Sequence, residues 1–232
     1  MTDKSETNKA HLLAAILPHV AFDGWSDKSF AAAAEESGVS LEDAREICPR
    51  GAIDLAIAFH HQGDAAMVER LAKADLSEVR FRDKVATALQ FRIEAMTDKE
   101  AVRRASTLFA LPVHAPDGAR LVWETADHIW TALGDTSRDG NWYSKRLTLS
   151  GVWAATVLFW LGDDSSDHAE TTAFIDRRID DVMKIEKLKA DLRENPFTKP
   201  LMSLQSALFD KMKAPDPAAM DDLPGRWKGS VS

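Results

Sequence analysis

The chain has 232 residues, of which 45% are hydrophobic and 28% charged, and its formal net charge is −8. This size and apolar content suffice for one domain, or for one domain with a small N-terminal subdomain. The single cysteine, Cys48, excludes an internal disulfide and a thiolate metal site, as expected in a reducing compartment.

Targeting and spanning segments are not recognisable in the sequence. The N-terminal residues lack both a hydrophobic signal region and an Arg-rich transit pattern. The uncharged run 147–162 has 16 residues, fewer than the about 20 that cross a bilayer as a helix, so we expect a buried core helix there. The simplest interpretation is a cytoplasmic protein of bacterial type.

Apolar residues at helical spacing occur in nearly every part of the chain, and we find no alternating strand pattern and no repeat. The first helix is predicted to kink at Pro18 and to end at Asp23-Gly24. Polar caps predict further helix starts at Asp64, at Ser77 and in the box 97–100. The expected fold is all-α, with about nine or ten helices.

Residues 9–50 have the pattern of a helix-turn-helix subdomain. Ser26 is the predicted cap of its second helix, Gly38 lies in the turn, and Ser40 caps a short third helix that ends before Pro49. In a DNA-binding protein this third helix would enter the major groove. Residues 41–47 carry three acids and one base, so this face would repel phosphates. We therefore expect a helix-turn-helix scaffold that binds no nucleic acid.

Catalytic constellations are missing from the sequence. There is no phosphate-binding loop, no nucleophile elbow and no cysteine or histidine cluster at ligand spacing. His60 and His61 are adjacent, so we expect them on different sides of a helix as solvated or hydrogen-bonded bystanders. Glu124 and His128 could share a helix face, but a di-iron site needs paired Glu-x-x-His motifs and two further glutamates. We expect no enzymatic activity, no metal and no cofactor.

Five of the seven tryptophans lie between positions 123 and 160. Trp123 and Trp130 are seven residues apart, as are Trp153 and Trp160, and seven residues are about two helical turns. Each pair therefore occupies one helix face. Such faces either belong to a packed core or frame an apolar pocket, and the spacing alone leaves both alternatives open.

A group of aromatic, amide and basic residues follows the turn 134–140 and begins a helix, where we expect partial exposure. Tyr, Trp and Arg are the residues that most often anchor protein interfaces. In the alternative, Arg146 holds the start of the helix by pairing with Asp139 or Asp163. The candidate partner-binding residues are Asn141, Trp142, Tyr143 and Arg146.

The last part of the chain changes character. Asn195-Pro196 ends a long helix that begins near Asp167, and Lys199-Pro200 opens another helix with an apolar stripe and cationic ends. Such a helix lies in the headgroup layer of a membrane, or it docks on its own domain or on a second copy. The stripe consists of Leu201, Leu204, Leu208, Phe209 and Met212.

Three segments together carry a family resemblance: residues 141–153 (NWYSKRLTLSGVW), 159–166 (FWLGDDSS) and 174–183 (FIDRRIDDVM). They resemble the C-terminal half of the COQ9 family, and the resemblance extends over roughly residues 9–213. It implies a TetR-repressor-like helical fold, binding of a lipid, and assistance to the di-iron hydroxylase that acts late on prenylated quinone precursors.

The resemblance also assigns roles to the residues named above. It favours membrane binding by the last helix, and docking of the hydroxylase at Asn141, Trp142, Tyr143 and Arg146. It favours a lipid pocket over a plain core for the tryptophan region, with an isoprenoid quinone precursor or another lipid as ligand. The residues then expected at the lipid are Trp123, Trp130, Val152, Trp153, Thr156, Phe159 and Trp160.

The expected organisation is a flexible N-terminus at 1–8, the helix-turn-helix-like subdomain at 9–50 and a lipid-binding and partner-binding domain at 51–194. An amphipathic membrane helix at 195–213 and a flexible tail at 214–232 follow. The expected function is that of a non-catalytic accessory protein, cytoplasmic and peripherally associated with the inner membrane, that presents a quinone precursor to the hydroxylase. The alternative is a degenerate TetR-family regulator that responds to a ligand. A homodimer is left open.

Overall fold

The computed structural model describes residues 3–138 and 140–194. This part of the chain is entirely helical, with nine α-helices and one 3-10 turn, which confirms the all-α prediction. The elements in chain order are α1 (Asp3–Asp23), α2 (Asp27–Ser37), α3 (Leu41–Ile47), α4 (Ala52–Lys73), α5 (Phe81–Glu94), α6 (Lys99–Ala110), α7 (Ala115–Ala132), α8 (Gly140–Leu161), η1 (Ser166–His168) and α9 (Ala169–Glu194).

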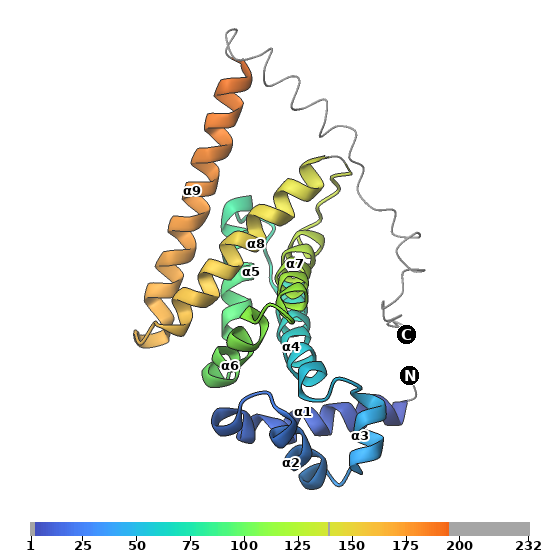
Figure 1. Cartoon of the computed structure of the whole chain (residues 1–232). Coiled ribbons are helices and arrows are strands. Elements are labelled where there is room, and N and C mark those ends of the chain that lie inside the picture. The colour runs from blue at the N-terminus through green and yellow to red at the C-terminus, as the bar shows by residue number, and fades with distance from the viewer. Residues whose placement is uncertain (1–2, 139, 195–232) are drawn as a thin grey trace.

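Helices α1, α2 and α3 form one end of the molecule (Figure 1). Ser26 caps α2 by accepting a hydrogen bond from the backbone N–H of Ser29, and Ser40 caps α3 through the N–H of Asp43. Gly38 ends α2 with a φ of 68°, a left-handed conformation that glycine adopts without a steric penalty. The predicted helix-turn-helix geometry is therefore present, and Phe30 and Ala44 are fully buried in its core.

Some of the predicted helix boundaries are wrong. The helix α1 already begins at Asp3, within the segment expected to be flexible, although it contains Pro18 and ends at Asp23 as predicted. Asp64 does not cap a helix but lies buried in the middle of α4, while α5 begins after Arg80 and not at Ser77. Polar residues such as Asp and Ser occupy caps, turns and buried hydrogen-bonded positions alike, so their presence alone does not fix a helix start.

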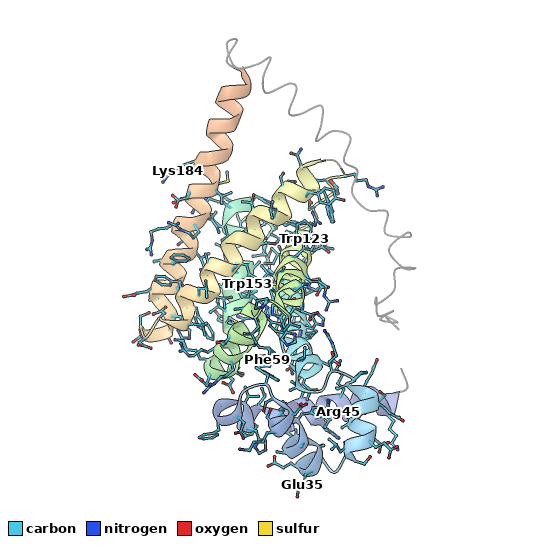
Figure 2. The ribbon with its side chains drawn as sticks, viewed as in Figure 1. Glu35, Arg45, Phe59, Trp123, Trp153 and Lys184 are labelled. Carbon is cyan, nitrogen blue, oxygen red and sulfur yellow. The ribbon has the colours of Figure 1, made fainter. Side chains whose placement is uncertain are left out.

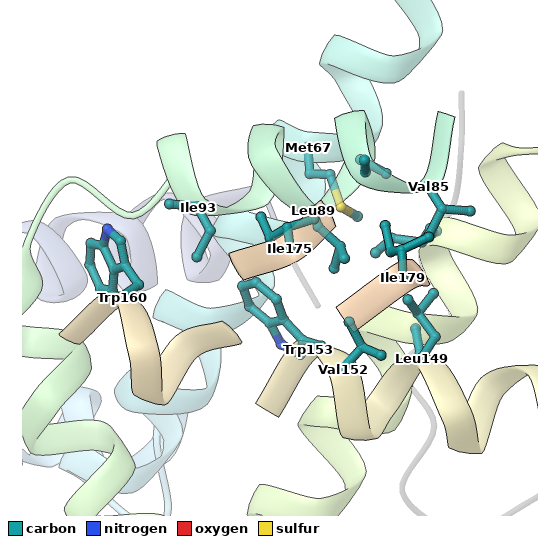
Figure 3. Packing of buried hydrophobic residues seen from close by; sticks show 14 of the residues in the cluster. Met67, Val85, Leu89, Ile93, Leu149, Val152, Trp153, Trp160, Ile175 and Ile179 are labelled. Atoms are coloured by element: carbon teal, nitrogen blue, oxygen red, sulfur yellow. The ribbon is translucent and has the colours of Figure 1, made fainter. Parts of the chain in front are cut away.

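Two hydrophobic cores hold the fold together. The first lies between α1–α3 and the adjoining parts of α4 and α6, and the indole Nε1 of Trp25 donates to the Ala101 carbonyl of α6 at 3.1 Å. The second fills the bundle of α4, α5, α7, α8 and α9. Figure 3 shows Met67 and Leu89 facing Trp153 of α8 and Ile175 of α9 in this second core.

Helix α9 packs along α8 and α5 and then extends beyond the bundle (Figure 1). Its inner face buries Ile175 and Ile179. Arg178 pairs with Asp181 within the helix, and Asp180 pairs with Arg82 of α5. Among the described residues, no helix has the length and apolar content needed to span a bilayer.

Candidate functional site

A cavity of about 570 Å³ lies where the two cores meet. It is lined mainly by apolar side chains from α1, α4, α6, α7 and α8, together with residues at the end of α5, and Figure 2 labels two of them, Phe59 and Trp153. Leu158 of α8 also lines the cavity although it is 68% exposed, so the cavity reaches the surface beside it. This volume is within the range typical of small-molecule sites.

Small side chains create the space. Helix α4 presents Ala56, Gly63 and Ala66 to the cavity, α6 presents Ala105, and α8 presents Ala154. Larger residues at these positions would fill the gap, because protein interiors otherwise pack to crystal-like density. The cavity is thus a consequence of residue choice on several helices at once.

A buried polar cluster forms part of the cavity wall. Asp64 of α4 is 1% exposed and accepts a hydrogen bond from Arg92 Nε of α5 at 2.6 Å. The Thr125 hydroxyl of α7 donates to the same Asp64 oxygen at 2.9 Å, and His128 Nδ1 lies 3.3 Å from the other oxygen. His60 Nε2 lies 2.9 Å from the Thr125 hydroxyl. Of these residues, His60 and Arg92 line the cavity.

The environment sets the charge of each group in this cluster. Burial raises the pKa of Asp64, but its hydrogen bonds and the nearby positive charge outweigh that effect and hold the pKa well below its usual range. Burial lowers the pKa of His60 to about 4, so the imidazole is neutral at pH 7. The hydrogen bond to Asp64 raises the pKa of His128. Asp64 and Arg92 therefore form a buried ion pair beside a neutral histidine.

A second feature lies at the start of α8, away from the cavity. The rings of Trp123, Trp142 and Tyr143 form an aromatic patch, with centroids 4.8 Å apart for Trp142 and Tyr143 and 5.8 Å apart for Trp123 and Trp142. All three side chains are half-buried. Such a patch offers apolar area together with polar groups at its edge, as interface anchors do.

Arg146 packs against the Trp142 ring and stabilises the aromatic patch. Its guanidinium lies 4.0 Å from the centroid of the Trp142 ring, and it donates to Asp127 at 2.6 Å and to Asp135 at 3.0 Å. Arg146 is only 2% exposed, so the prediction that it is partly exposed is wrong. Helix α7 and the turn after it bring the carboxylates of Asp127 and Asp135 to Arg146. Of the partners suggested from sequence, Asp163 instead accepts hydrogen bonds from Ser165 and Thr171, and Asp139 lies outside the described residues.

Several side chains donate hydrogen bonds to the Asp135 carboxylate. Burial raises its pKa, but hydrogen bonds from Lys145, Ser137 and Arg146 outweigh burial and hold the pKa at about 2. Lys145 Nζ lies 2.8 Å from the carboxylate and 2.7 Å from the Ser137 hydroxyl. These bonds hold the turn before α8 against the first turns of the helix. They also fix the position of the residues beside the aromatic patch.

The residues expected at the lipid do not all reach the cavity. Trp153 lines it, whereas Val152, Thr156 and Trp160 are buried on α8 outside its lining. Phe159 stacks on Phe174 of α9 at 4.4 Å. Of the other two, Trp130 stacks on Phe81 at 5.5 Å and Trp123 belongs to the aromatic patch. Asn141 is exposed, and the residues expected at the membrane, 201–212, lie outside the described part of the chain.

Most of the cavity lining was missed because it comes from α1, α4 and α6. Runs such as Ala65-Ala66 and Ala105-Ser106 read as ordinary helix positions. The available signal was the presence of Gly63 within an otherwise continuous helical pattern, since glycine inside a helix commonly marks a close approach of another group.

The fold has a solved counterpart. A TetR transcriptional regulator from Nitrosomonas europaea superposes with a TM-score of 0.61, covering 74% of this chain and 95% of the regulator, at 17% sequence identity. This similarity confirms the TetR-like fold expected from sequence.

Sequence relatives add the family. A probable ubiquinone biosynthesis protein coq9 from Dictyostelium discoideum is 30% identical over 195 residues, which are 80% of this chain and 63% of the relative. Ubiquinone biosynthesis protein COQ9 from Drosophila melanogaster is 31% identical over 190 residues, which are 80% of this chain and 58% of the relative. The chain thus spans about three fifths of the length of these relatives, both described as mitochondrial. The COQ9 family model also matches residues 115–186, which include the aromatic patch and α8, so this part of the chain matches the COQ9 family.

Proposed function

We propose that this protein is a non-catalytic lipid-binding accessory protein of ubiquinone biosynthesis. The observation that carries the proposal is the apolar cavity between the two cores in a chain that matches the COQ9 family over residues 115–186. Its relatives are named as ubiquinone biosynthesis proteins. The ligand that we assign to the cavity is a prenylated quinone precursor, which has a long isoprenoid tail. Burial of such a tail contributes roughly 0.8 kcal/mol per methylene group, so an apolar cavity suits it.

A protein partner is the second part of the proposal. The aromatic patch of Trp123, Trp142 and Tyr143, with the exposed Asn141 beside it, is the surface that we assign to the di-iron demethoxyubiquinone hydroxylase. Its support is chemical: clustered aromatic residues held by a buried arginine are typical of interface anchors. Arg146 contributes to this surface by fixing Trp142 and not by direct contact.

Membrane association is the third part. We assign it to the helix expected within residues 195–213, where Leu201, Leu204 and Leu208 form the centre of an apolar stripe bordered by lysines. A peripheral site of this kind would let the protein take a prenylated precursor from the bilayer and present it to the hydroxylase.

Regulation of transcription is the competing function, and the charge of α3 opposes it. Glu42, Asp43 and Glu46 are all exposed on this helix. Its one base, Arg45, is paired with Asp27 at 2.7 Å. A helix with this surface would repel phosphates, on which DNA affinity largely depends.

Native mass spectrometry of the purified protein, followed by extraction of the bound lipid, tests the proposal. We expect a prenylated aromatic or quinone ligand, lost in Ala154→Phe, which fills the cavity from α8. Leu147→Phe is the matched control, because it adds a similar ring to the exposed face of the same helix. A folded Ala154→Phe variant that retains the ligand, or a wild-type protein that carries none and binds none on addition, would refute the cavity as the lipid site.

A further inference from the structure

The guanidinium of Arg92, in the polar cluster, does not use all of its N–H groups in hydrogen bonds to the described residues. Arg92 is 2% exposed; its Nε donates to Asp64 and its Nη2 donates to the His60 carbonyl at 3.0 Å. Its third nitrogen, Nη1, makes no hydrogen bond to any residue that the structure describes. Arg92 itself lines the cavity, and its guanidinium lies 5.2 Å from the centre of the Trp153 ring, which lines it as well.

The Arg92 side chain has unused donor capacity. A guanidinium carries five N–H groups, and the two hydrogen bonds to Asp64 and His60 leave the others available to a ligand. An oxygen on a ligand in the cavity would supply the missing acceptor. Leu158, which also lines the cavity, is exposed and apolar, so the cavity has an apolar edge at the surface in addition to the buried guanidinium.

We propose that Arg92 is a head-group subsite, which orients an amphiphile in the cavity by donating from Nη1 to a neutral oxygen of its head while the tail runs toward Leu158. The ligand class is an aromatic or quinonoid ring with carbonyl, hydroxyl or methoxy oxygens on an apolar chain. This inference rests on the proposed lipid-binding function and extends it to the choice and direction of the lipid.

The charge balance of the cluster selects a neutral head. The positive charge of Arg92 is already matched by the Asp64 carboxylate at 2.6 Å, and His60 adds no charge at pH 7. A carboxylate head would place a second negative charge near Asp64 in a water-poor cavity, where charges interact strongly. A ring oxygen accepts the same hydrogen bond without adding that charge.

The absence of a side chain at Gly63 leaves room for the guanidinium of Arg92. A Cβ built at this position would lie 2.4 Å from Arg92 Nη1 and 2.6 Å from its Cζ. Arg92 would have to shift, and its short bond to Asp64 restricts that movement. Gly63→Ala therefore displaces the donor and leaves every charge of the cluster in place.

Three ligands test the subsite: a dimethoxy-methyl-benzoquinone with a decyl chain, decylbenzene as the same shape without oxygens, and decanoate. Each is titrated against the full-length protein by displacement of 1-aminoanthracene, a neutral fluorophore for apolar cavities. The variants are Gly63→Ala and the neutral pair Arg92→Gln with Asp64→Asn. Gly151→Ala is the control, since a methyl group there meets no atom within 4 Å.

We expect both variants to weaken quinone binding by about tenfold, as for loss of one hydrogen bond to a charged group, and to leave decylbenzene within twofold. Circular dichroism checks the fold, and if the double variant does not fold, Gly63→Ala alone decides. Equal losses for quinone and decylbenzene, or no loss for either, would overturn the subsite. A tenfold loss of decanoate binding would instead assign Arg92 to carboxylates. If no ligand binds the wild-type protein, the proposed function itself fails.

Discussion

Arg146, at the start of α8, has two charged partners and one aromatic partner. Its side chain is 3% exposed, it bonds two carboxylates, and the Trp142 ring covers it. Removing one partner of a buried ion pair leaves the other charge uncompensated, which costs far more than the pair contributes as a whole. The residue therefore belongs to the stability of the domain as much as to its surface.

Substitution of Arg146→Gln should lower the free energy of unfolding by about 3 kcal/mol, because it removes two hydrogen bonds between charged groups, to Asp127 and to Asp135, and leaves only Lys145 beside Asp135. Urea unfolding followed by circular dichroism measures this change. Arg178→Gln is the control, since Arg178 pairs with Asp181 on a solvated face of α9, and its loss should cost less than about 1 kcal/mol. Similar small losses in both variants would mean that Arg146 is not buried as described.

The pH dependence of stability should report on His60. Its pKa is about 4 in the folded protein against 6.5 for a free histidine, so below pH 6.5 the unfolded chain binds a proton that the folded protein does not. Stability is full above pH 6.5 and falls as the pH drops toward 4, by about 3 kcal/mol for this one group.

Urea unfolding of wild type and His60→Gln between pH 7 and 4 isolates this effect. The variant should lose less stability over that range, while contributions of the opposite sign from His128, whose pKa is raised, cancel in the comparison. His61→Gln serves as the neighbouring control, because His61 is exposed and pairs with Glu124 at 3.0 Å. Parallel pH profiles for wild type and His60→Gln would contradict a buried neutral His60.

At the scale of helices, local signals were reliable where the chemistry is local. The caps at Ser26 and Ser40 were predicted because a side chain and a backbone N–H three residues away make each of them. The box predicted at 97–100 is one residue early, since Asp98 caps α6 through the N–H of Ala101. The burial of Asp64 was not predicted, because its partner Arg92 lies 28 residues further along the chain and no local pattern marks the pair.

The tryptophan spacing shows the same limit. It places Trp153 and Trp160 on one face of α8, and both are fully buried. Whether a helix face meets a cavity or a neighbouring helix depends on the size of side chains elsewhere, here the alanines and glycine of α4 and α6. The lipid role of these tryptophans stays a prediction, and the cavity contact of Trp153 supports it.

Truncation of the aromatic patch at the start of α8 should weaken binding of the proposed hydroxylase partner. Tyr143→Ala is expected to weaken binding of the di-iron hydroxylase by about thirtyfold, the loss of 2 kcal/mol that is common for an interface anchor. Biolayer interferometry with the purified hydroxylase measures this affinity. Ser144→Ala, at the next and exposed position, is the control. If Tyr143→Ala melts several degrees lower, the ring serves the fold; unchanged affinity and melting would remove both roles.

The segment 195–213, where the sequence predicts an amphipathic helix, should carry membrane binding. Leu204→Asp combined with Leu208→Asp should abolish co-sedimentation with anionic liposomes, since apolar insertion outweighs the about 1 kcal/mol that each lysine adds near the surface. High salt should weaken wild-type binding only in part. Gln205→Asp with Ser206→Asp adds the same charge to the polar side and should leave binding largely intact. Liposome binding by the leucine variant would place the membrane site elsewhere.

At the scale of the whole molecule, the cavity joins the two cores. Leu17 belongs to the helix-turn-helix end, and Trp153 belongs to the bundle, yet both line the same space. The hydrogen bond from Trp25 to the carbonyl of Ala101 ties the same two parts together. A ligand in the cavity contacts both parts, so it should stabilise the molecule as one unit and raise the melting temperature with ligand concentration.

Helix α7 carries two neighbouring residues, one of which contacts the support of the aromatic patch and the other the polar cluster at the cavity. Asp127 bonds Arg146 beneath the aromatic patch, and the next residue, His128, contacts Asp64 in the cavity wall. A small rotation of α7 would disturb both contacts together. Lipid and hydroxylase should therefore be thermodynamically linked, each changing the affinity of the other by the same factor. Titrating the hydroxylase with and without the decyl quinone, and the quinone with and without the hydroxylase, measures both factors. If both equal one, α7 transmits nothing, and the protein holds its lipid and its enzyme as independent cargoes.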